Sequence, residues 1–204
     1  MMQTALADVL CNAHAADAPV CDLSASGEAA EGLALRTLDM RDAHLTACRF
    51  IACDFTQAGF VDVVFERCAF EACRFAEAYF RRARFVDCKA DGANFAGARL
   101  HETALTDSSF RYANFTDGAW QRVDVRGCTL REAALSSLRL SRSVFQECDL
   151  TGADLFRTAL CGLDLSTCTL DGIVLSADCA ELRGASIGAL QAVELARLLG
   201  VKIV

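Results

Sequence analysis

The stretch Leu45–Gln57 reads LTACRFIACDFTQ and contains two consecutive five-residue blocks, CRFIA and CDFTQ. Each block opens on a cysteine and carries a phenylalanine two positions later. Cysteines in this pattern are compatible with a metal site, a disulfide or a structural repeat. The repeat explanation extends furthest, because every fifth residue from Met40 to Leu175 is a large apolar residue except Ala90. A fixed period over so long a stretch is typical of solenoid proteins.

The residue two positions before each large one is usually Ala, Cys, Ser, Thr or Gly. A period of five fits neither a 3.6-residue helix nor an alternating strand, so the backbone must turn a corner once in each block. Residues two apart in an extended segment share a face, so the small and the large residue both point inward. A narrow tube cannot hold two large side chains per block, which explains the small partner.

The cysteines measure the length of one coil. At steps of 20 residues, one inward position holds Cys48, Cys68, Cys88, Ser108, Cys128, Cys148 and Cys168. A second ladder starts at Cys53 and Cys73 and continues as alanine at positions 93, 113, 133 and 153. Four blocks per coil predict an all-β solenoid with four faces, in which neighbouring coils pair at the strand spacing of about 4.8 Å.

Blocks such as ANFAG (93–97), ANFTD (113–117) and ADLFR (153–157) resemble the pentapeptide-repeat proteins, whose block has the form A(D/N)LXX. The resemblance implies a right-handed quadrilateral β-helix of 20 residues per coil, a handedness that spacing alone does not give. We expect this body to span residues 33–187. Residues 1–32 fit the frame poorly, and we predict an N-terminal cap, either a short helix or a mobile arm.

The repeat frame shifts by two residues after Leu175, since Leu182 and Ile187 then take the central position, and this predicts a bulge at 176–181. The segment 188–200, GALQAVELARLLG, is typical of a helix with Gly200 as its C-cap. Its wide apolar girdle leaves two alternatives: a simple cap, or an isologous dimer contact, which we favour. In the dimer, residues 188–204 form the interface, VKIV (201–204) supplies a short strand, and the contact residues are Leu190, Val193, Leu195, Leu198 and Leu199.

The same tail is similar to the C-terminal segments of quinolone-resistance pentapeptide proteins of the Qnr and MfpA type. That resemblance implies tail-to-tail dimers that bind type II DNA topoisomerases. No loop interrupts the blocks, so the uninterrupted MfpA-like pattern is the nearer match.

The chain offers no signature of an enzyme, a metal or a cofactor. The cysteines of CRFIAC are separated by four residues and point into the core from different faces, and the three histidines do not cluster with them. No nucleophile elbow, P-loop or dinucleotide-binding glycine motif is present. No apolar run approaches about 18 residues, and no signal peptide is evident. We therefore expect a cytoplasmic protein whose twelve cysteines are reduced and mainly fill the core.

The net charge of −7 argues against direct nucleic-acid binding and moves attention to the outer faces. The face centred on Phe65 and Phe85 is acidic, whereas the face centred on Phe60 and Phe80 carries an excess of arginine. The predicted partner-binding residues on the acidic face are Glu66, Asp87, Asp107, Asp124, Glu147 and Asp164. Those of the arginine face are Arg41, Arg81, Arg82, Arg99, Arg122, Arg139 and Arg142.

The resemblance implies a non-enzymatic DNA mimic that binds DNA gyrase or topoisomerase IV, inhibiting it or protecting it from quinolones or a natural gyrase toxin. Seven coils give a body about 34 Å long, and two joined end to end approach the length of about 20 base pairs. The acidity is modest for such a mimic, and a face that merely contacts solvent would account for the charges equally well. The alternative function is a scaffold that binds an unrelated protein through its arginine face.

Overall fold

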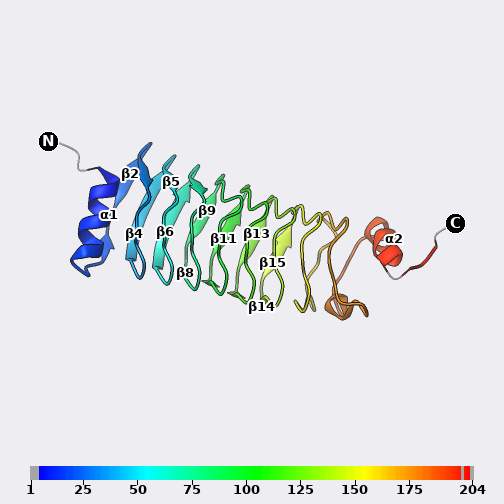
Figure 1. Cartoon of the computed structure of the whole chain (residues 1–204). Coiled ribbons are helices and arrows are strands. Elements are labelled where there is room, and N and C mark those ends of the chain that lie inside the picture. The colour runs from blue at the N-terminus through cyan, green and yellow to red at the C-terminus, as the bar shows by residue number, and fades with distance from the viewer. Residues whose placement is uncertain (1–4, 199, 203–204) are drawn as a thin grey trace.

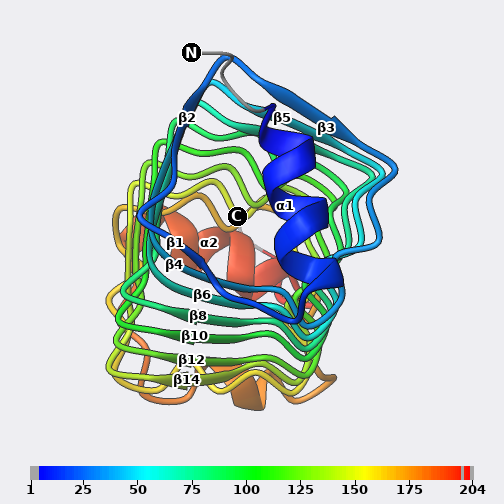
Figure 2. The ribbon, with the colours of Figure 1, turned by 90° about the vertical axis from the view of Figure 1, so that its left-hand side faces the viewer.

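The computed structural model of the chain describes residues 5–198 and 200–202. The chain winds into a row of stacked coils between an N-terminal helix, α1, and a C-terminal helix, α2 (Figure 1). Seen along the row, the coils enclose a tube with four sides (Figure 2). No helix in the described ranges is long and apolar enough to cross a membrane. The predicted all-β solenoid is confirmed.

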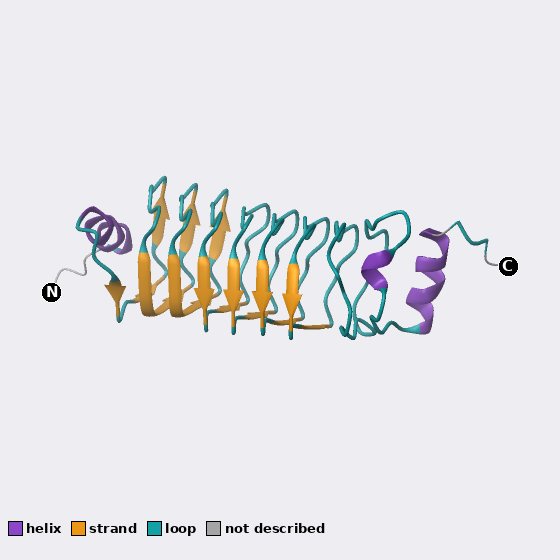
Figure 3. Ribbon diagram, turned by 90° about the horizontal axis from the view of Figure 1, so that it is seen from below, coloured by secondary structure: helices purple, strands orange, loops and turns teal. Residues whose placement is uncertain are grey.

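Short strands form two parallel sheets along the sides of this tube (Figure 3). The larger sheet has 12 strands and the smaller contains β3, β5 and β7. The strand bounds are β1 (Val20–Cys21), β2 (Ser24–Ser26), β3 (Ala29–Glu31), β4 (Asp39–Thr46), β5 (Arg49–Ile51), β6 (Gly59–Glu66), β7 (Ala69–Glu71), β8 (Tyr79–Arg81), β9 (Arg84–Val86), β10 (Arg99–His101), β11 (Ala104–Thr106), β12 (Ala119–Gln121), β13 (Asp124–Arg126), β14 (Arg139–Ser141) and β15 (Val144–Gln146).

The strand register confirms the predicted coil length. Phe65 pairs with Phe85, Leu105 with Phe85, and Leu105 with Val125, each step being 20 residues. The fourth side has no named strand and is joined by isolated parallel bridges from Ala34–Asp54 to Asp154–Val174. Residues one coil apart are therefore direct neighbours all along the body.

The corner that a five-residue period requires is a residue with positive φ. These residues recur every fifth position through most of the chain, as at Ala52, Gln57, Asp62 and Arg67, with φ between 52° and 61°. The N–H of such a residue points along the axis and bonds to a carbonyl of the next coil, as Ala52 does to Glu71 at 2.8 Å. Positive φ is energetically unfavourable for an L residue, and the axial hydrogen bond offsets this cost at the corner.

Phenylalanine rings fill the tube in columns. Phe55, Phe75, Phe95 and Phe115 stack one above the next with centroids 4.8 to 5.0 Å apart and nearly parallel rings. Rings on adjacent sides of one coil meet edge to face, as in the T-shaped pair of Phe50 and Phe55. Both geometries are favourable for aromatic pairs. The column spacing equals the strand spacing, so ring stacking and backbone pairing reinforce one another.

The inward cysteines pack in the tube wall and donate to backbone carbonyls. Cys68 Sγ lies 3.2 Å from the Leu45 carbonyl oxygen, and Cys88 Sγ lies 3.3 Å from that of Phe65. Ser108 takes the same position in its coil, donating to Thr106 at 2.8 Å and accepting from the Cys88 N–H at 2.9 Å. A hydroxyl and a thiol are therefore interchangeable in this column as small, weakly polar fillers.

The predicted N-terminal cap, residues 1–32, is wrong in its extent. Helix α1 (Leu6–Ala15) is a cap, and Leu6 and Leu10 are buried over the end of the tube. Residues 20–31, however, form β1, β2 and β3, which pair with the next coil in the 20-residue register. Small residues hid this first coil, because Ala25 and Ala30 stand where later coils mostly have phenylalanine or leucine. The two leucines of α1 supply the volume that these alanines lack.

The predicted two-residue frame shift at the C-terminal end is confirmed. Leu160 donates to the carbonyl of Glu181 at 2.9 Å, and Leu165 donates to that of Ser186 at 2.8 Å, so the offset exceeds 20 residues. A short 3-10 helix, η1 (Ala180–Leu182), takes up the extra chain. Helix α2 (Ala189–Leu198) then closes the body within the predicted segment 188–200.

Glu181 is buried at the frame shift, and its carboxylate stabilises the shifted backbone through hydrogen bonds. It accepts the backbone N–H of Arg157 at 2.9 Å and the hydroxyl of Ser176 at 2.7 Å. Burial disfavours its charged form, but the hydrogen bonds from Ser176 and Arg157 prevail and lower the pKa of Glu181 below its ordinary value. The side chain thus supplies an acceptor where the shifted coil offers no backbone carbonyl.

We predict that Cys128→Ser changes the free energy of unfolding by about 1 kcal/mol or less, because the hydroxyl retains the contact of the thiol with the Arg126 carbonyl. Cys128→Leu should cost about 1 to 3 kcal/mol by overfilling the tube. Urea unfolding followed by circular dichroism measures both. A serine variant as unstable as the leucine variant would contradict a packing role for this column.

We predict that Glu181→Ala destabilises the protein at pH 7 by about 2 kcal/mol, since it removes a buried carboxylate that accepts the Arg157 N–H and the Ser176 hydroxyl. The folded pKa of Glu181 is depressed, so its contribution is complete above the ordinary glutamate pKa of about 4.3 and declines as the pH falls below it. The melting temperatures of the two proteins should therefore converge as the pH falls below about 4.3 and through the lower folded pKa of Glu181.

Glu71→Ala is the control for this comparison, because Glu71 is about half exposed and pairs with Arg49 on the surface. Its effect should stay below about 1 kcal/mol at every pH. A Glu181 variant that tracks this control would show that the frame shift does not depend on the carboxylate.

Candidate partner-binding surface and C-terminal helix

The structure places all six predicted acidic residues on one side of the solenoid, next to the strands β6, β9, β11, β13 and β15. They do not form one continuous patch, because they occupy three different columns. Asp87, Asp107 and Glu147 lie in the corner column, each with φ near 50°. Glu66 stands at the end of β6, whereas Asp124 and Asp164 lie at the opposite edge of the face.

Two of the six carboxylates are neutralised by neighbours. Glu66 contacts Arg67 at 2.6 Å and His44 at 3.3 Å. Asp124 contacts Arg126 at 2.8 Å, and the Arg126 guanidinium also reaches Gln146. Exposed pairs of this kind add little stability, but they remove net charge from the surface.

The corner column retains its charge. Among the described residues, Asp87, Asp107 and Glu147 have no basic partner within ion-pair distance, and all three are exposed. The fourth position of this column is Gly127, and the Asp107 carboxylate leans into the space where its Cβ would stand. Asp164 accepts the N–H of Ser166 at 2.9 Å, and hydrogen bonds from Ser166 lower the pKa of Asp164. Four of the six predicted residues thus present unpaired negative charge at neutral pH.

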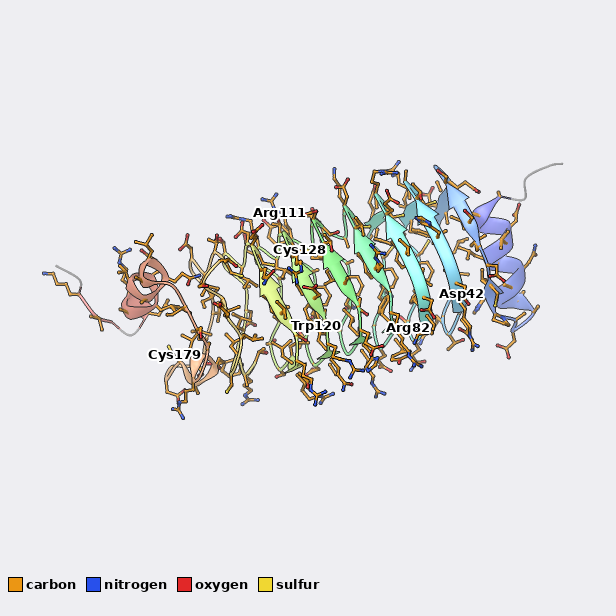
Figure 4. The ribbon with its side chains drawn as sticks, turned by 180° about the vertical axis from the view of Figure 1, so that it is seen from behind. Asp42, Arg82, Arg111, Trp120, Cys128 and Cys179 are labelled. Carbon is orange, nitrogen blue, oxygen red and sulfur yellow. The ribbon has the colours of Figure 1, made fainter. Side chains whose placement is uncertain are left out.

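The arginine face is less basic than its composition suggests. From Asp62 to Arg122 its corner column alternates in sign, so residues one coil apart pair with each other: Arg82 with Asp62, and Arg122 with Glu102 at 2.7 Å. The hydrogen bond from Arg82 lowers the pKa of Asp62 and keeps it charged. Figure 4 shows Arg82 among the side chains that project from the coils. Within the described ranges, the arginines left without an acidic partner on this face are Arg81, Arg99, Arg139 and Arg142.

The C-terminal helix presents apolar side chains to solvent, although not all those predicted. Leu190 is 86% exposed, Leu198 46% and Val193 36%. Leu195 differs, because it is buried against its own chain and is therefore unavailable for a partner. Leu199 lies outside the described residues, as do Ile203 and Val204 of the predicted terminal strand, and Val201 and Lys202 form no strand within this chain.

Gln191 holds the helix on the coil end, a role that the sequence did not reveal. Its side-chain amide donates to the carbonyls of Leu165 and Cys168 at 2.7 and 2.5 Å and accepts the Gly188 N–H at 2.5 Å. The polar stripe predicted from Gln191, Glu194 and Arg197 is therefore not uniformly turned to solvent. A polar residue one turn from the helix start, facing open carbonyls of the last coil, is the signal that could have indicated this contact.

The Cys128 thiol is suited to packing and not to nucleophilic chemistry. Burial raises the pKa of the Cys128 thiol to about 11, which keeps it protonated and poorly nucleophilic at neutral pH. No three His, Cys, Asp or Glu side chains converge as metal ligands within residues 5–198 and 200–202. The outer faces and the helix surface remain the candidate sites.

Comparison with known proteins agrees with this architecture. Residues 58–135 match the family described as a pentapeptide repeat region. Curated protein sequences gave no match. A trypsin-treated variant of QnrB1, a plasmid-mediated fluoroquinolone resistance protein, superposes with a TM-score of 0.56 at 19% identity, covering 89% of this chain and 98% of that one.

Two further solved structures match with lower TM-scores. Full-length QnrB1 matches at 18% identity and a TM-score of 0.41, covering 87% of this chain and all of its own. HetL of Nostoc sp. strain PCC 7120, a pentapeptide repeat protein involved in heterocyst differentiation regulation, matches at 16% identity and a TM-score of 0.26, covering 90% and 97% of the two chains. Residues 58–135 are therefore a pentapeptide repeat region, and the fold of the chain resembles that of QnrB1.

Proposed function

We propose that this protein is a non-enzymatic mimic of DNA that binds DNA gyrase or topoisomerase IV in the cytoplasm, and thereby inhibits the enzyme or protects it from quinolones or a natural gyrase toxin. The observation that carries the proposal is the unpaired corner column of Asp87, Asp107 and Glu147 on an uninterrupted solenoid. The likeness of the fold to a fluoroquinolone resistance protein supports the choice of partner.

The proposed mechanism depends on charges held at fixed spacing. Neighbouring coils place Asp87 and Asp107 about 4.8 Å apart along a stiff edge. Duplex DNA carries one charge per about 1.7 Å of axis, so this edge is a sparse mimic. Its affinity must then come from preorganisation and shape as well as from charge, because a rigid ligand loses little entropy on binding.

We further propose that two chains join through the C-terminal helix to form a rod of double length. The support is the exposure of Leu190, Val193 and Leu198 at the end of a body whose other apolar residues are largely buried. Burial of this surface against a second copy would remove it from water. Leu195 contributes only by supporting the helix from below.

We predict that Asp107→Lys weakens binding to gyrase at least tenfold, or about 1.4 kcal/mol, by reversing a charge in the corner column. Asp117→Lys is a matched control, since Asp117 is also an exposed corner residue, with φ 59°, on a different side of the same coil. The net charge change is identical. Equilibrium binding of labelled protein to gyrase and supercoiling assays with and without ciprofloxacin provide the measurements.

Each outcome of this comparison is informative. Equal weakening by both variants would mean that overall charge, not the corner column, drives binding. If the unaltered protein neither binds gyrase nor changes supercoiling or drug sensitivity, the mimicry proposal fails. Arg139→Glu then tests the alternative, a scaffold whose partner contacts the unpaired arginines, in binding assays with acidic peptides.

We predict that Leu190→Asp converts a dimer to a monomer without loss of folding, because this side chain is almost fully exposed in one chain. Truncation before the helix is a poorer test, since it also removes Gln191 and Leu195 from the coil end. Light scattering gives the mass, and Tyr112→Asp, which alters an exposed residue on the body, is the control. A monomeric unaltered protein would refute the dimer.

A further inference from the structure

The ladder of hydrogen bonds between coils is regular up to residues 138–157. Backbone hydrogen bonds cross the junction between coils 118–137 and 138–157. The N–H of Arg122 donates to the carbonyl of Ser141 at 2.8 Å, that of Arg139 to the carbonyl of Gly118 at 3.0 Å, and that of Val144 to the carbonyl of Val123 at 2.9 Å. Strands β12 and β13 pair with β14 and β15 across the same junction. This junction is therefore closed on all of its sides.

One coil further on, the equivalent bonds are missing. The N–H groups of Arg142, Ala159 and Asp164 have no acceptor among the residues that the structure describes. Strands β14 and β15 end the larger sheet, with no partner in the coil that follows (Figure 3). The N–H of Glu147 bonds instead to the Thr167 hydroxyl at 3.0 Å, a side chain standing in for a backbone carbonyl. The junction is open along two adjacent sides.

The other two sides of this junction keep their ladder. The backbone N–H of Thr169 donates to the carbonyl of Cys148, and the N–H of Leu150 donates to the carbonyl of Thr169, both at 2.9 Å. The N–H of Val174 donates to the carbonyl of Ala153 at 2.9 Å. Such a joint, closed along one pair of sides and open along the other, can bend about its closed edge with little loss of hydrogen bonding.

Residues beyond the open sides are tied to the C-terminal end and not to the coil before them. The backbone N–H groups of Leu160 and Leu165 donate to the carbonyls of Glu181 and Ser186, which lie after the frame shift. Gln191 of α2 also bonds to the Leu165 carbonyl. Residues 159–198 thus form one connected unit, whose backbone ladder to the body is confined to two adjacent sides. On the open sides, the side chains of Thr167 and Glu181 accept the N–H groups of Glu147 and Arg157.

Solvent reaches the core at the opening. Leu140 is only partly buried, whereas its column neighbours Phe80, Leu100 and Trp120 are at most 3% exposed. A groove of about 210 Å³ separates the two coils and is lined by Ser143, Val144, Phe145, Gln146, Gly162, Leu163, Asp164 and Thr167.

The core beside the opening differs from the coils before it. Leu138 and Leu163 stand at inward positions that hold alanine, glycine, valine or threonine in coils 58–137. Leu38 occupies the same column as Leu138 in a coil whose ladder is intact, so an inward leucine does not open a junction by itself. At the open junction, a cavity of about 10 Å³ lies among apolar side chains that include Leu138, Leu140 and Leu163.

We infer that this junction is a hinge: the unit 159–198 swings about the closed edge at 148–155, and in a minor closed state segment 159–164 pairs with β14 and β15. Closure gives the N–H groups of Arg142, Ala159 and Asp164 their ladder partners and covers Leu140. The inference does not depend on the proposed function, since it concerns only the connection between the body and the C-terminal unit.

Amide hydrogen exchange tests the open state in the full-length protein. Arg142, Ala159 and Asp164 should exchange roughly a hundredfold faster than Arg122, Arg139 and Val144, their equivalents one coil earlier. The comparison is internal, because both sets lie on the same two sides of one molecule. Equal protection of the two sets would overturn the open junction and with it the hinge.

Disulfide trapping tests closure. In Ser141→Cys, the new thiol and the exposed Cys161 become register partners only when the junction closes. The control carries Gln121→Cys, Ser141→Cys and Cys161→Ser, whose two new thiols face each other across the closed junction. Cys179 is replaced by serine in both proteins.

Under mild oxidation, the 141–161 bond should form to completion but about tenfold more slowly than the 121–141 bond, as expected for a minor state. Absence of the 141–161 bond once the control has reacted would show a fixed gap. Formation at the control rate, within about twofold, would show a junction that is already closed. Either result overturns the hinge.

Discussion

The left-handed corner that recurs at every fifth position is the constraint on which this molecule depends. An L residue adopts positive φ at a cost of about 1 to 2 kcal/mol, and the chain repeats that cost in block after block. Through the regular coils, the corner N–H points along the axis and bonds to the next coil, as Gln57 does to Ala76 at 2.8 Å. A corner is therefore stable only when another coil lies beside it, so the fold forms as a stack or not at all.

The same stacking decides which charges a partner can meet. Because residues 20 apart are neighbours, the charge pattern down a column matters more than the composition of a face. The column with Asp62, Arg82, Glu102 and Arg122 alternates in sign and pairs internally. In the column that runs from Asp87 to Glu147 all the charges are negative, and Arg67, one coil earlier, pairs with Glu66 instead. Two faces with similar numbers of charged residues thus differ in the charge that they leave available.

Most of the fold was predictable because period and side-chain size are properties of the sequence alone. The 20-residue coil, the inward cysteines, the two-residue shift after Leu175 and the C-terminal helix all follow from them. The first coil was missed because Ala25 and Ala30 lack the bulk that marks a central position. The missing bulk comes from helix α1, which lies outside the repeat. The sequence pattern records the size of each side chain, whereas the filling of this coil depends on the helix that packs against it.

The candidate site was predicted less completely. Placing the six acids on one side required only the coil length, but their pairing with Arg67 and Arg126 depends on side-chain geometry. The burial of Leu195 and the inward turn of Gln191 depend on how α2 sits on the last coil, which no periodicity specifies. The leucines at 138 and 163 were visible in the sequence, but the opening of the ladder beside them is a property of two coils together.

Stacking of equal coils makes the length of the body a discrete quantity. Removal or duplication of 20 residues within 58–117 leaves every inward column with a neighbour of the same kind, so the rod shortens or lengthens by one step of about 4.8 Å. An insertion of any other size misaligns all later columns, and the two extra residues near Glu181 come where the regular coils stop. Genetic events of one size are therefore tolerated by the core, whereas on the surface they change which charges meet: removal of the coil that carries Arg82 sets Asp62 beside Glu102.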